Sequence, residues 1–336
     1  MTVKITIIGL GQIGASVGLA LANHKDQITT LGHDKSPETA RKAQKRGAVE
    51  SISYNLPASV EGADVVVLAI PFDEMYETLK IIAQDVGEDA VVMDTAPVKA
   101  VVAEWAKELL PPKSHYIGLT PALNPALLEE AALGLEAARA DLFQKGVIAL
   151  TAPQGTREEV LKLAADFVAF LGALPFFADI AEVDGLMASA HFLPGLAAAA
   201  LAETVTGQPG WSDIRKLAGK SYSTTTRPLD GNESAPEAEA ILHDRVNSLR
   251  VLDGYIATLV SLREDIASEN KKELRTRLEV ARRGRAQWQL DRLKGDWLAV
   301  EVGGQEMPKA SDILKQQIGG LGKLFGRHDK KNLDED

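Results

Sequence analysis

The sequence has no cysteine among its 336 residues. The protein therefore has no disulfide, no thiolate metal site and no cysteine nucleophile, and we expect no metal site in it. Basic residues are also in the minority, with 37 Lys and Arg against 47 Asp and Glu and a net charge of −10. Binding to nucleic acid or to an anionic membrane surface requires basic patches, so we expect neither kind of partner. An anionic substrate is not excluded, because a few local arginines decide that.

Long apolar runs are absent as well. None approaches the roughly 20 apolar residues of a membrane span, and the apolar run at residues 5–8 is too short for the core of a signal peptide. We therefore predict a cytoplasmic protein with no membrane association. With 45% hydrophobic residues, a chain of this length is too long for one core and sufficient for two domains.

Short apolar runs alternate with helical patterns in the first half of the sequence. Runs typical of buried strands lie at residues 3–8, 28–32, 65–70, 91–94, 116–118 and 147–151. Helical patterns lie at residues 15–23, 37–45 and 157–171. Strands that are apolar throughout and alternate with helices form parallel sheets covered on both faces. We therefore predict an α/β, doubly wound Rossmann domain over residues 1–178.

The second half carries only helical patterns, at residues 182–206, 237–266 and 271–293, and predicts an all-α C-terminal domain over residues 179–300. The stretch from Ala188 to Ala202 is apolar nearly all round and should be buried on every side, in the centre of this domain or in a subunit interface. We expect a homodimer formed through the helical domain. Residues 301–336, rich in charge and glycine, predict a partly mobile C-terminal extension.

A glycine motif, Gly9-x-Gly11-x-x-Gly14, lies directly after the first strand and opens the first helix. Gly9 allows a tight turn, Gly11 lets a pyrophosphate approach the backbone, and Gly14 lets the helix pack close to the strand. The start of the helix then offers N–H groups and the positive end of its dipole to the phosphates. We predict a dinucleotide site at these glycines, with Gln12 and Ile13 between them also contacting the cofactor.

The predicted dinucleotide is NAD, with NADP as the alternative. Asp34 ends the second strand about 20 residues beyond the last glycine, where an acidic side chain accepts hydrogen bonds from the adenosine ribose. Its charge repels a 2′-phosphate and so favours NAD. Lys35 and Arg41 lie nearby and would weaken this preference.

Two further segments end strands at the same edge of the predicted sheet. They are Ala69-Ile70-Pro71 and Asp94-Thr95. In a doubly wound sheet the carboxyl ends of the strands face the ligand crevice, so we expect both segments to line the nicotinamide half of the cofactor.

Five segments occur in a recognisable order: GLGQIGAS at residues 9–16, DTAPVK at 94–99, ADLF with IALT between 140 and 151, VD through HFLP between 183 and 194, and TTR at 225–227. Together they resemble the prephenate/arogenate dehydrogenase family of tyrosine biosynthesis, over roughly residues 3–295. In that family a hydride passes from the ring carbon bearing a hydroxyl to the nicotinamide, and carbon dioxide leaves from the opposite ring carbon. The resemblance implies an NAD(P)-dependent oxidoreductase and a homodimer, with Arg227 as the cation for a carboxylate of the substrate.

The sequence departs from the family pattern at the position that matters most for the chemistry. The family histidine that accepts a hydrogen bond from the substrate hydroxyl is Thr120 here. Threonine can donate or accept a hydrogen bond but cannot serve as a general base near neutral pH. We therefore predict Thr120, His191 and Arg227 as the catalytic residues, with His191 or His115 near the substrate in a rearranged site.

Three other departures replace polar residues of the family with less polar ones. The serine before valine-lysine is Pro97, the histidine before Asp184 is Val183, and the histidine after leucine-proline is Gly195, in a motif that also has one extra residue. These changes keep two alternatives open. One is a dinucleotide-binding paralogue without turnover, and the other is a dehydrogenase of a different small carboxylate. A β-hydroxyacid or imine dehydrogenase is disfavoured, because that group carries a catalytic lysine in its first long helix and none lies between Asp179 and Gln208. The choice between prephenate and arogenate stays open.

Overall fold

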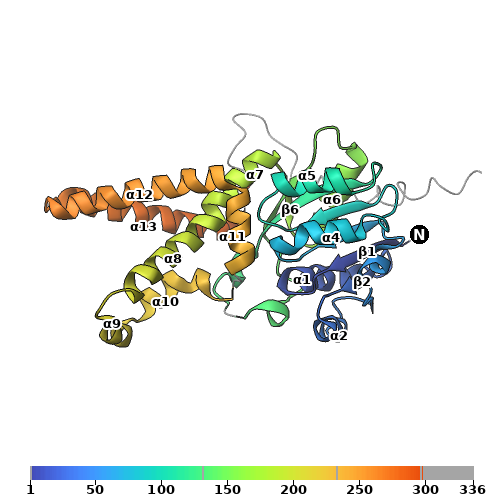
Figure 1. The fold of residues 1–336 in the computed structure, drawn as a ribbon, viewed down its shortest axis with the longest axis horizontal. Helices are drawn as coiled ribbons and strands as arrows, with labels where there is room; N and C mark the ends of the chain where they lie inside the picture. The colour runs from blue at the N-terminus through green and yellow to red at the C-terminus, as the bar shows by residue number, and fades with distance from the viewer. Residues whose placement is uncertain (1, 131, 232–233, 296, 298–336) are drawn as a thin grey trace, which may run out of the picture.

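The computed structural model describes residues 2–130, 132–231, 234–295 and 297. It shows an α/β domain from which helices extend to one side as an arm (Figure 1). The α/β, doubly wound domain and the all-α domain that follows it are confirmed. The expected extension at residues 301–336 lies outside the described residues.

The α/β domain is built on one sheet of eight strands. They are β1 (Val3–Ile8), β2 (Ile28–His33), β3 (Ser51–Ile52), β4 (Val65–Leu68), β5 (Val91–Asp94), β6 (His115–Ala122), β7 (Val147–Thr151) and β8 (Leu174–Phe177). Their order across the sheet is β3-β2-β1-β4-β5-β6-β7-β8. The chain starts at β1 in the middle of the sheet, runs outward to β3 and then crosses back over β1 to β4. The strand order therefore reverses between β1 and β4, beside the glycine motif that follows β1.

The sheet is not wholly parallel, which corrects the expectation from the sequence. β6 and β7 are antiparallel, while the other neighbouring pairs are parallel. The reason is the connection: residues 123–146 return at the same edge of the sheet through two short 3-10 turns, η3 (Pro125–Leu127) and η4 (Gly134–Ala137), and a parallel pair would need a crossover. Two edge strands were also not predicted, because β3 has two residues and β8 contains Pro175.

Helices cover both faces of the sheet. Three helices pack on one face and share a first hydrophobic core with it: α1 (Gln12–Leu21), α2 (Pro37–Lys45) and α6 (Glu158–Phe170). Three others pack on the opposite face in a second core: α3 (Leu56–Val60), α4 (Met75–Ile82) and α5 (Ala100–Leu109). Along β4, Val65 and Val67 belong to the first cluster and Val66 and Leu68 to the second. The strand is therefore apolar throughout because both of its faces are buried.

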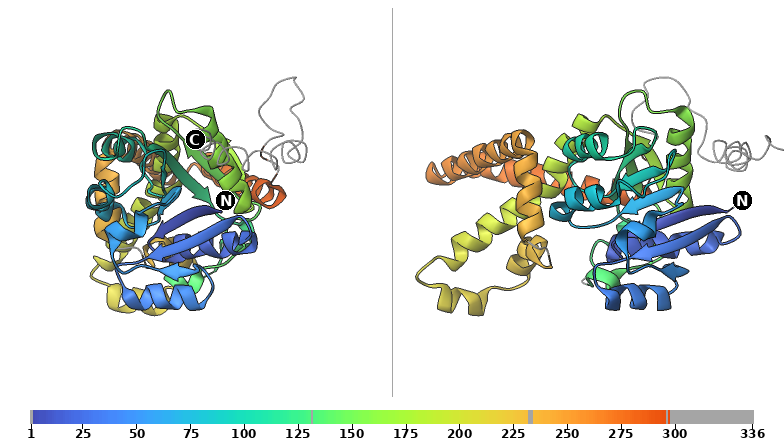
Figure 2. Two further views of the ribbon diagram at one scale, coloured as in Figure 1. Left: turned by 90° about the vertical axis from the view of Figure 1, so that its right-hand side faces the viewer. Right: turned by 45° about the vertical axis from the view of Figure 1, so that its right-hand side comes forward.

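The second domain is helical. It consists of α7 (Ile180–Met187), a π-helical turn η5 (Ala188–Phe192), α8 (Leu193–Thr206), α9 (Trp211–Leu217), α10 (Lys220–Thr226), the 3-10 turn η6 (Arg227–Leu229), α11 (Ser234–His243), α12 (Arg245–Ala267) and α13 (Lys271–Lys294). The helix expected at residues 237–266 is two helices that meet at Asp244. α12 and α13 pack against each other as a long antiparallel pair that projects away from the sheet, as both figures show (Figures 1 and 2).

The π-helical turn accounts for the extra residue noted before Leu193-Pro194. A π turn widens an α-helix by one residue and is frequent at functional sites. Around it, Asp184, Ala188 and Phe192 are buried at intervals of four, and the burial continues to Gly195 at an interval of three. The helix therefore keeps one buried face despite the insertion.

The sequence suggested that the long apolar helix is buried on every side. Within this chain, only one of its faces is buried. Between residues 188 and 202 only Ala188, Phe192, Gly195 and Ala198 are buried. The continuous helix Ile180–Thr206 is 27 residues long and apolar enough to cross a membrane by length and composition alone. The expectation that no stretch approaches the length of a membrane span is therefore wrong. A helix buried between two subunits has the same apolar composition.

The two domains are joined by a buried carboxylate. Asp184 of α7 accepts hydrogen bonds from the backbone N–H groups of Lys99 (2.6 Å) and Ala100 (3.0 Å) at the start of α5. Its residue is 3% exposed. Nearby, Ala188 and Phe192 pack in the same cluster as Leu68 of β4. The helical domain is thus held against the carboxyl edge of the sheet.

We expect Asp184→Ala to lower the free energy of unfolding by about 2–4 kcal/mol, because two buried N–H donors lose their acceptor. Urea-induced unfolding measures this. The matched control is Asp179→Ala, which removes the exposed N-cap of the same helix, where the carboxylate accepts from Ala181 N at 2.8 Å; we expect it to cost about 1 kcal/mol. Equal losses in the two variants would show that Asp184 is not the junction.

Candidate active site

The glycine loop between β1 and α1 has the geometry that a bound dinucleotide needs. Gly9 has a φ of +86°, and a Cβ there would lie 2.3 Å from the carbonyl oxygen of Ala69. A Cβ at Gly14 would lie 1.9 Å from the carbonyl oxygen of Gly9. A Cβ at Gly11, in contrast, would meet nothing within 4 Å. The chain's own packing thus explains Gly9 and Gly14, while the space beside Gly11 is left for a ligand.

The start of α1 is also suited to an anion. Its N-cap, Gly11, provides no side-chain cap, so the first N–H groups of the helix have no side-chain acceptor at that position. Gln12 and Ile13, both partly exposed, are the first two residues of the helix. The residues present therefore fit the pyrophosphate of a dinucleotide.

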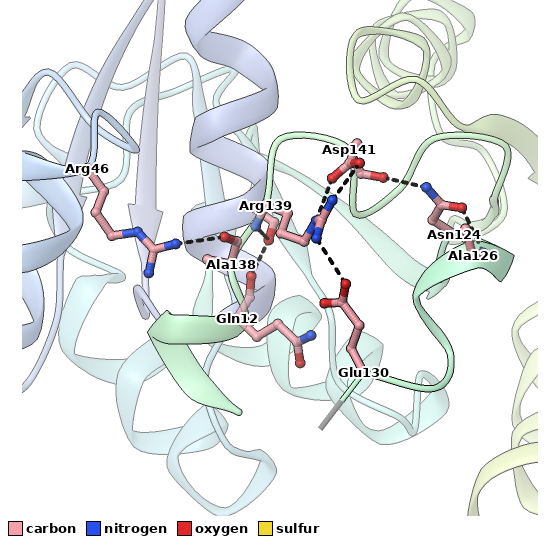
Figure 3. A network of polar contacts seen from close by, with 9 residues as sticks. Gln12, Arg46, Asn124, Ala126, Glu130, Ala138, Arg139 and Asp141 are labelled. Atoms are coloured by element: carbon pink, nitrogen blue, oxygen red, sulfur yellow. Dashed lines mark hydrogen bonds and ion pairs between the residues drawn. The ribbon is translucent and has the colours of Figure 1, made fainter. Parts of the chain in front are cut away.

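Hydrogen bonds hold the segment between β6 and β7 against the first turns of α1 (Figure 3). Arg139 N donates to Ser16 Oγ at 2.9 Å, and Ser16 Oγ donates to the carbonyl of Gln12 at 2.6 Å. Arg46, the C-cap residue of α2, donates to the carbonyl of Ala138 at 3.0 Å, and the Arg139 side chain pairs with Asp141 at 2.8 Å. This segment forms one wall beside the glycine loop.

Asp34 lies at the end of β2, next to the loop. One carboxylate oxygen accepts from Leu10 N and the other from Ser36 N, each at 2.8 Å. These bonds fix the carboxylate, and each oxygen keeps a further lone pair for a ribose hydroxyl. The Lys35 side chain forms an ion pair with Glu74 of the neighbouring turn η2 (Phe72–Glu74).

The residues at the ends of β4 and β5 differ in exposure, although the sequence suggested that both strand ends line the cofactor site. Ala69, Ile70, Pro71 and Thr95 are partly exposed just beyond the strands. The Asp94 side chain is fully buried, which corrects the expectation that it lines the cofactor site. At the end of β5 the residue that can face the crevice is therefore Thr95 and not Asp94.

Asp94 is instead the centre of a buried network. Its carboxylate pairs with Lys99 Nζ at 2.8 Å and accepts from Tyr116 Oη at 2.6 Å and from Ala96 N at 2.7 Å. Burial, reinforced by the charge of Asp94, raises the pKa of Tyr116 well above its usual range, so the phenol stays protonated and donates. Sequence reasoning did not identify Lys99 and Tyr116 as partners of Asp94; the DTAPVK segment contained Lys99 without showing where its side chain points.

Thr120 lies near the end of β6, two residues beyond the level at which β5 ends. Its Oγ1 is buried and has no hydrogen-bond partner in the described part of the protein. A hydroxyl in this state has both its donor and its acceptor capacity available. The predicted residue is therefore in a condition to bind a polar group of a ligand.

His191 belongs to the π turn η5, and its ring lies 5.5 Å from the ring of Phe192, between centroids. Desolvation lowers the pKa of His191, although the charge of Glu237 opposes this shift. Glu237, on α11, lies against Gly195: a Cβ at residue 195 would come within 2.4 Å of Glu237 Oε1. The Glu237 carboxylate thus lies where a side chain at position 195 would begin.

Arg227 is not an uncommitted cation. It forms an ion pair with Glu129 at 3.5 Å and donates to the carbonyl of Glu130, in the segment that follows β6. His115 lies at the beginning of β6, the opposite end from Thr120, and its ring contacts Arg157 at 2.6 Å. The suggestion that His115 lies near the substrate is therefore wrong. No cluster of three potential metal ligands of the His, Cys, Asp and Glu types is found among the described residues.

Comparison with known proteins covers both domains in order. The prephenate dehydrogenase nucleotide-binding domain matches residues 17–174, and the prephenate dehydrogenase dimerization domain matches residues 179–280. A probable prephenate dehydrogenase of Streptomyces niveus is 30% identical over 262 residues, which are 74% of this chain and 68% of that protein. The chain belongs to the prephenate dehydrogenase family.

Other members of the family agree in extent and fold. The cyclohexadienyl dehydrogenase of Zymomonas mobilis is 28% identical over 268 residues, 79% of this chain and 89% of that protein. The solved prephenate dehydrogenase from A. aeolicus, in complex with hydroxyphenyl propionate and NAD+, has a TM-score of 0.75 at 22% identity and covers 85% of this chain and 98% of its own. This likeness confirms the fold. The first segment of this prephenate dehydrogenase family member is thus a nucleotide-binding domain, and the second corresponds to the family's dimerization domain.

We expect Gly11→Ala to keep the stability of the parent protein and to lose dinucleotide affinity, because the added methyl enters only the space beside the loop and the φ of −73° suits alanine. Thermal unfolding with and without NAD measures both properties. The control, Gly14→Ala, should be destabilised without any ligand, since its methyl meets the carbonyl of Gly9. A full NAD-induced rise of the melting temperature in Gly11→Ala would place the pyrophosphate elsewhere.

Proposed function

We propose that this protein is an NAD-dependent dehydrogenase that oxidatively decarboxylates prephenate or arogenate in tyrosine biosynthesis. The observation that carries the proposal is the match, in order, of its two domains to the two domains of prephenate dehydrogenases. The bound cofactor would supply the acceptor for a hydride. Asp34, with its fixed carboxylate beside the loop, supports NAD over NADP.

Thr120 is proposed to bind the ring hydroxyl of the substrate. In the overall reaction a C–H bond gives up a hydride, the bond to the ring carboxylate breaks, and its electron pair makes the ring aromatic. The hydroxyl is present in the substrate and in the phenolic product, so no net proton has to leave it. A residue that only accepts or donates a hydrogen bond can therefore serve where the family has a histidine.

His191 and Arg227 are proposed to assist at the same site. The lowered pKa of His191 keeps its imidazole neutral near pH 7, so that one ring nitrogen can accept a hydrogen bond. Arg227 is tied to the segment after β6 and would offer its remaining N–H donors to a carboxylate. Ala69, Ile70, Pro71 and Thr95 would line the nicotinamide half.

A dinucleotide-binding protein without this turnover is the second candidate, favoured by Thr120 at the position of the family histidine. NADH formation followed at 340 nm separates the two. Purified protein is given NAD or NADP with prephenate or arogenate in turn. Turnover with either substrate supports the dehydrogenase, and a higher kcat/KM with NAD supports the cofactor preference. No turnover, while NAD still raises the melting temperature, would leave the second candidate.

We expect Thr120→Val to lower kcat/KM about tenfold through the loss of one hydrogen bond, with no loss of stability, since the hydroxyl has no partner in the protein. Thr151→Val is the matched control. Its Oγ1, on neighbouring β7, is also buried without a partner, and its loss should leave kcat/KM unchanged. The same kinetic constants in both variants and the parent would remove Thr120 from the site.

We also propose a homodimer formed through the helical domain. Leu249, Ile256 and Val260 lie on one stripe of α12 and are 46–48% exposed. The α8 helix beside it buries only one face. An apolar surface of this kind on a family dimerization domain favours a second copy of the chain as its cover.

Ile256→Glu should convert the dimer into a monomer, because a charge in a buried apolar interface lacks a partner. Sedimentation velocity gives the mass. Ile81→Glu is the control, with a residue of matching exposure (47% against 48%) on α4 of the other domain, and it should stay dimeric. A monomeric parent protein, or a dimeric Ile256→Glu, would contradict this interface.

A further inference from the structure

Arg292 is a buried arginine near the end of α13, beyond residue 280, where the match to the dimerization domain ends. It is 9% exposed. Its guanidinium donates to the carbonyl of Leu123 and lies 5.7 Å from the ring centre of Trp297. Within the part of the chain that the structure describes, no carboxylate forms an ion pair with it.

A cation in this position is unusual because burial removes it from water without supplying an opposite charge. Desolvation lowers the pKa of Arg292, and no acidic group among the described residues opposes this shift. Guanidinium has five N–H donors, and one carbonyl satisfies only part of them. Buried charges in proteins are paired or fully hydrogen-bonded, whereas among the described residues Arg292 has one carbonyl acceptor and the face of Trp297 but no carboxylate.

A second donor beside it is in the same condition. Trp297 Nε1 is buried and has no hydrogen-bond acceptor in the described residues. A buried indole N–H normally finds an acceptor. The Arg292 guanidinium and the Trp297 ring are neighbours, and one of these two donors is charged. An anionic acceptor such as a carboxylate would satisfy both.

The location connects this pair to the proposed reaction. Leu123 follows the last residue of β6, and Thr120 lies three residues earlier on the same strand. Three residues of extended chain span about 10 Å. A six-membered ring with a three-carbon acidic side chain has a comparable length, so a substrate whose hydroxyl lies at Thr120 can reach Arg292 with its far carboxylate.

We infer that Arg292 and Trp297 form an anion-binding subsite for the carboxylate of the substrate's three-carbon side chain. This inference rests on the proposed function and adds a substrate contact from outside the matched family domains. Arg227 shares its charge with Glu129, whereas Arg292 has its charge available to the ligand. A purely structural Arg292 would explain the bond to Leu123 but not the unsatisfied N–H of Trp297.

The test compares a carboxylate with a neutral probe of the same shape. 4-Hydroxyphenylpropionate and its primary amide are titrated calorimetrically into the full-length protein saturated with NAD. The parent protein should prefer the carboxylate at least about tenfold, which is the effect of one charge-assisted hydrogen bond. Arg292→Met should abolish the preference, and Trp297→Phe should weaken carboxylate binding without changing amide binding. Arg282→Met, an exposed arginine on the same helix, is the control and should behave as the parent.

Kinetics separate this subsite from the reaction itself. If prephenate or arogenate is turned over, Arg292→Met should raise KM about tenfold or more with kcat within about threefold, the pattern of lost uniform binding. Without turnover, an Arg292-dependent carboxylate preference would leave the subsite intact and overturn only the proposed reaction. A folded Arg292→Met with unchanged preference and KM would overturn the inference. So would equal binding of both probes by the parent, or an unchanged Trp297→Phe if Arg292→Met fails to fold.

Discussion

The rest of the molecule depends on one contact, in which the carboxylate of Asp184 on α7 binds the start of α5. It binds the backbone of Lys99 and Ala100, while the Lys99 side chain turns inward to the buried Asp94 and Tyr116. Removing one member of such a network leaves an uncompensated polar group, so its members hold one another in place. The helical domain is thereby docked against the edge of the sheet at which the strands end and the dinucleotide would lie.

Several polar groups of the proposed site have no partner among the described residues of the protein. Thr120 Oγ1 and Trp297 Nε1 are buried without partners, and Arg292 is buried without a counter-ion in the described structure. The space beside Gly11 is of the same kind, since no atom of the protein uses it. Stable proteins keep such groups few, because each costs free energy in the absence of a ligand. A ligand that used Thr120, Arg292 and the space beside Gly11 would remove part of this cost.

Much of the fold could be predicted from local sequence because the decisive patterns are short. Val65 to Leu68 is apolar on both faces, which indicates a central strand, and the glycines follow β1 directly. The antiparallel β6–β7 pair was not predictable in this way, since strand direction depends on a connection of 24 residues without regular pattern. β8 was missed for another reason: its residues, including Pro175, become a strand only because β7 offers an edge.

The sequence by itself determined the glycine loop, the family and the order of the two domains, because these depend on residues close together along the chain. Only the tertiary structure decided the state of the site residues. It buried Asp94 against Lys99, tied Arg227 to Glu129, put His115 at the far end of β6 and brought Arg292 to Leu123. Each of these depends on contacts or burial that the residue types and their spacing do not encode, since the partners meet only when the sheet and the helices have packed.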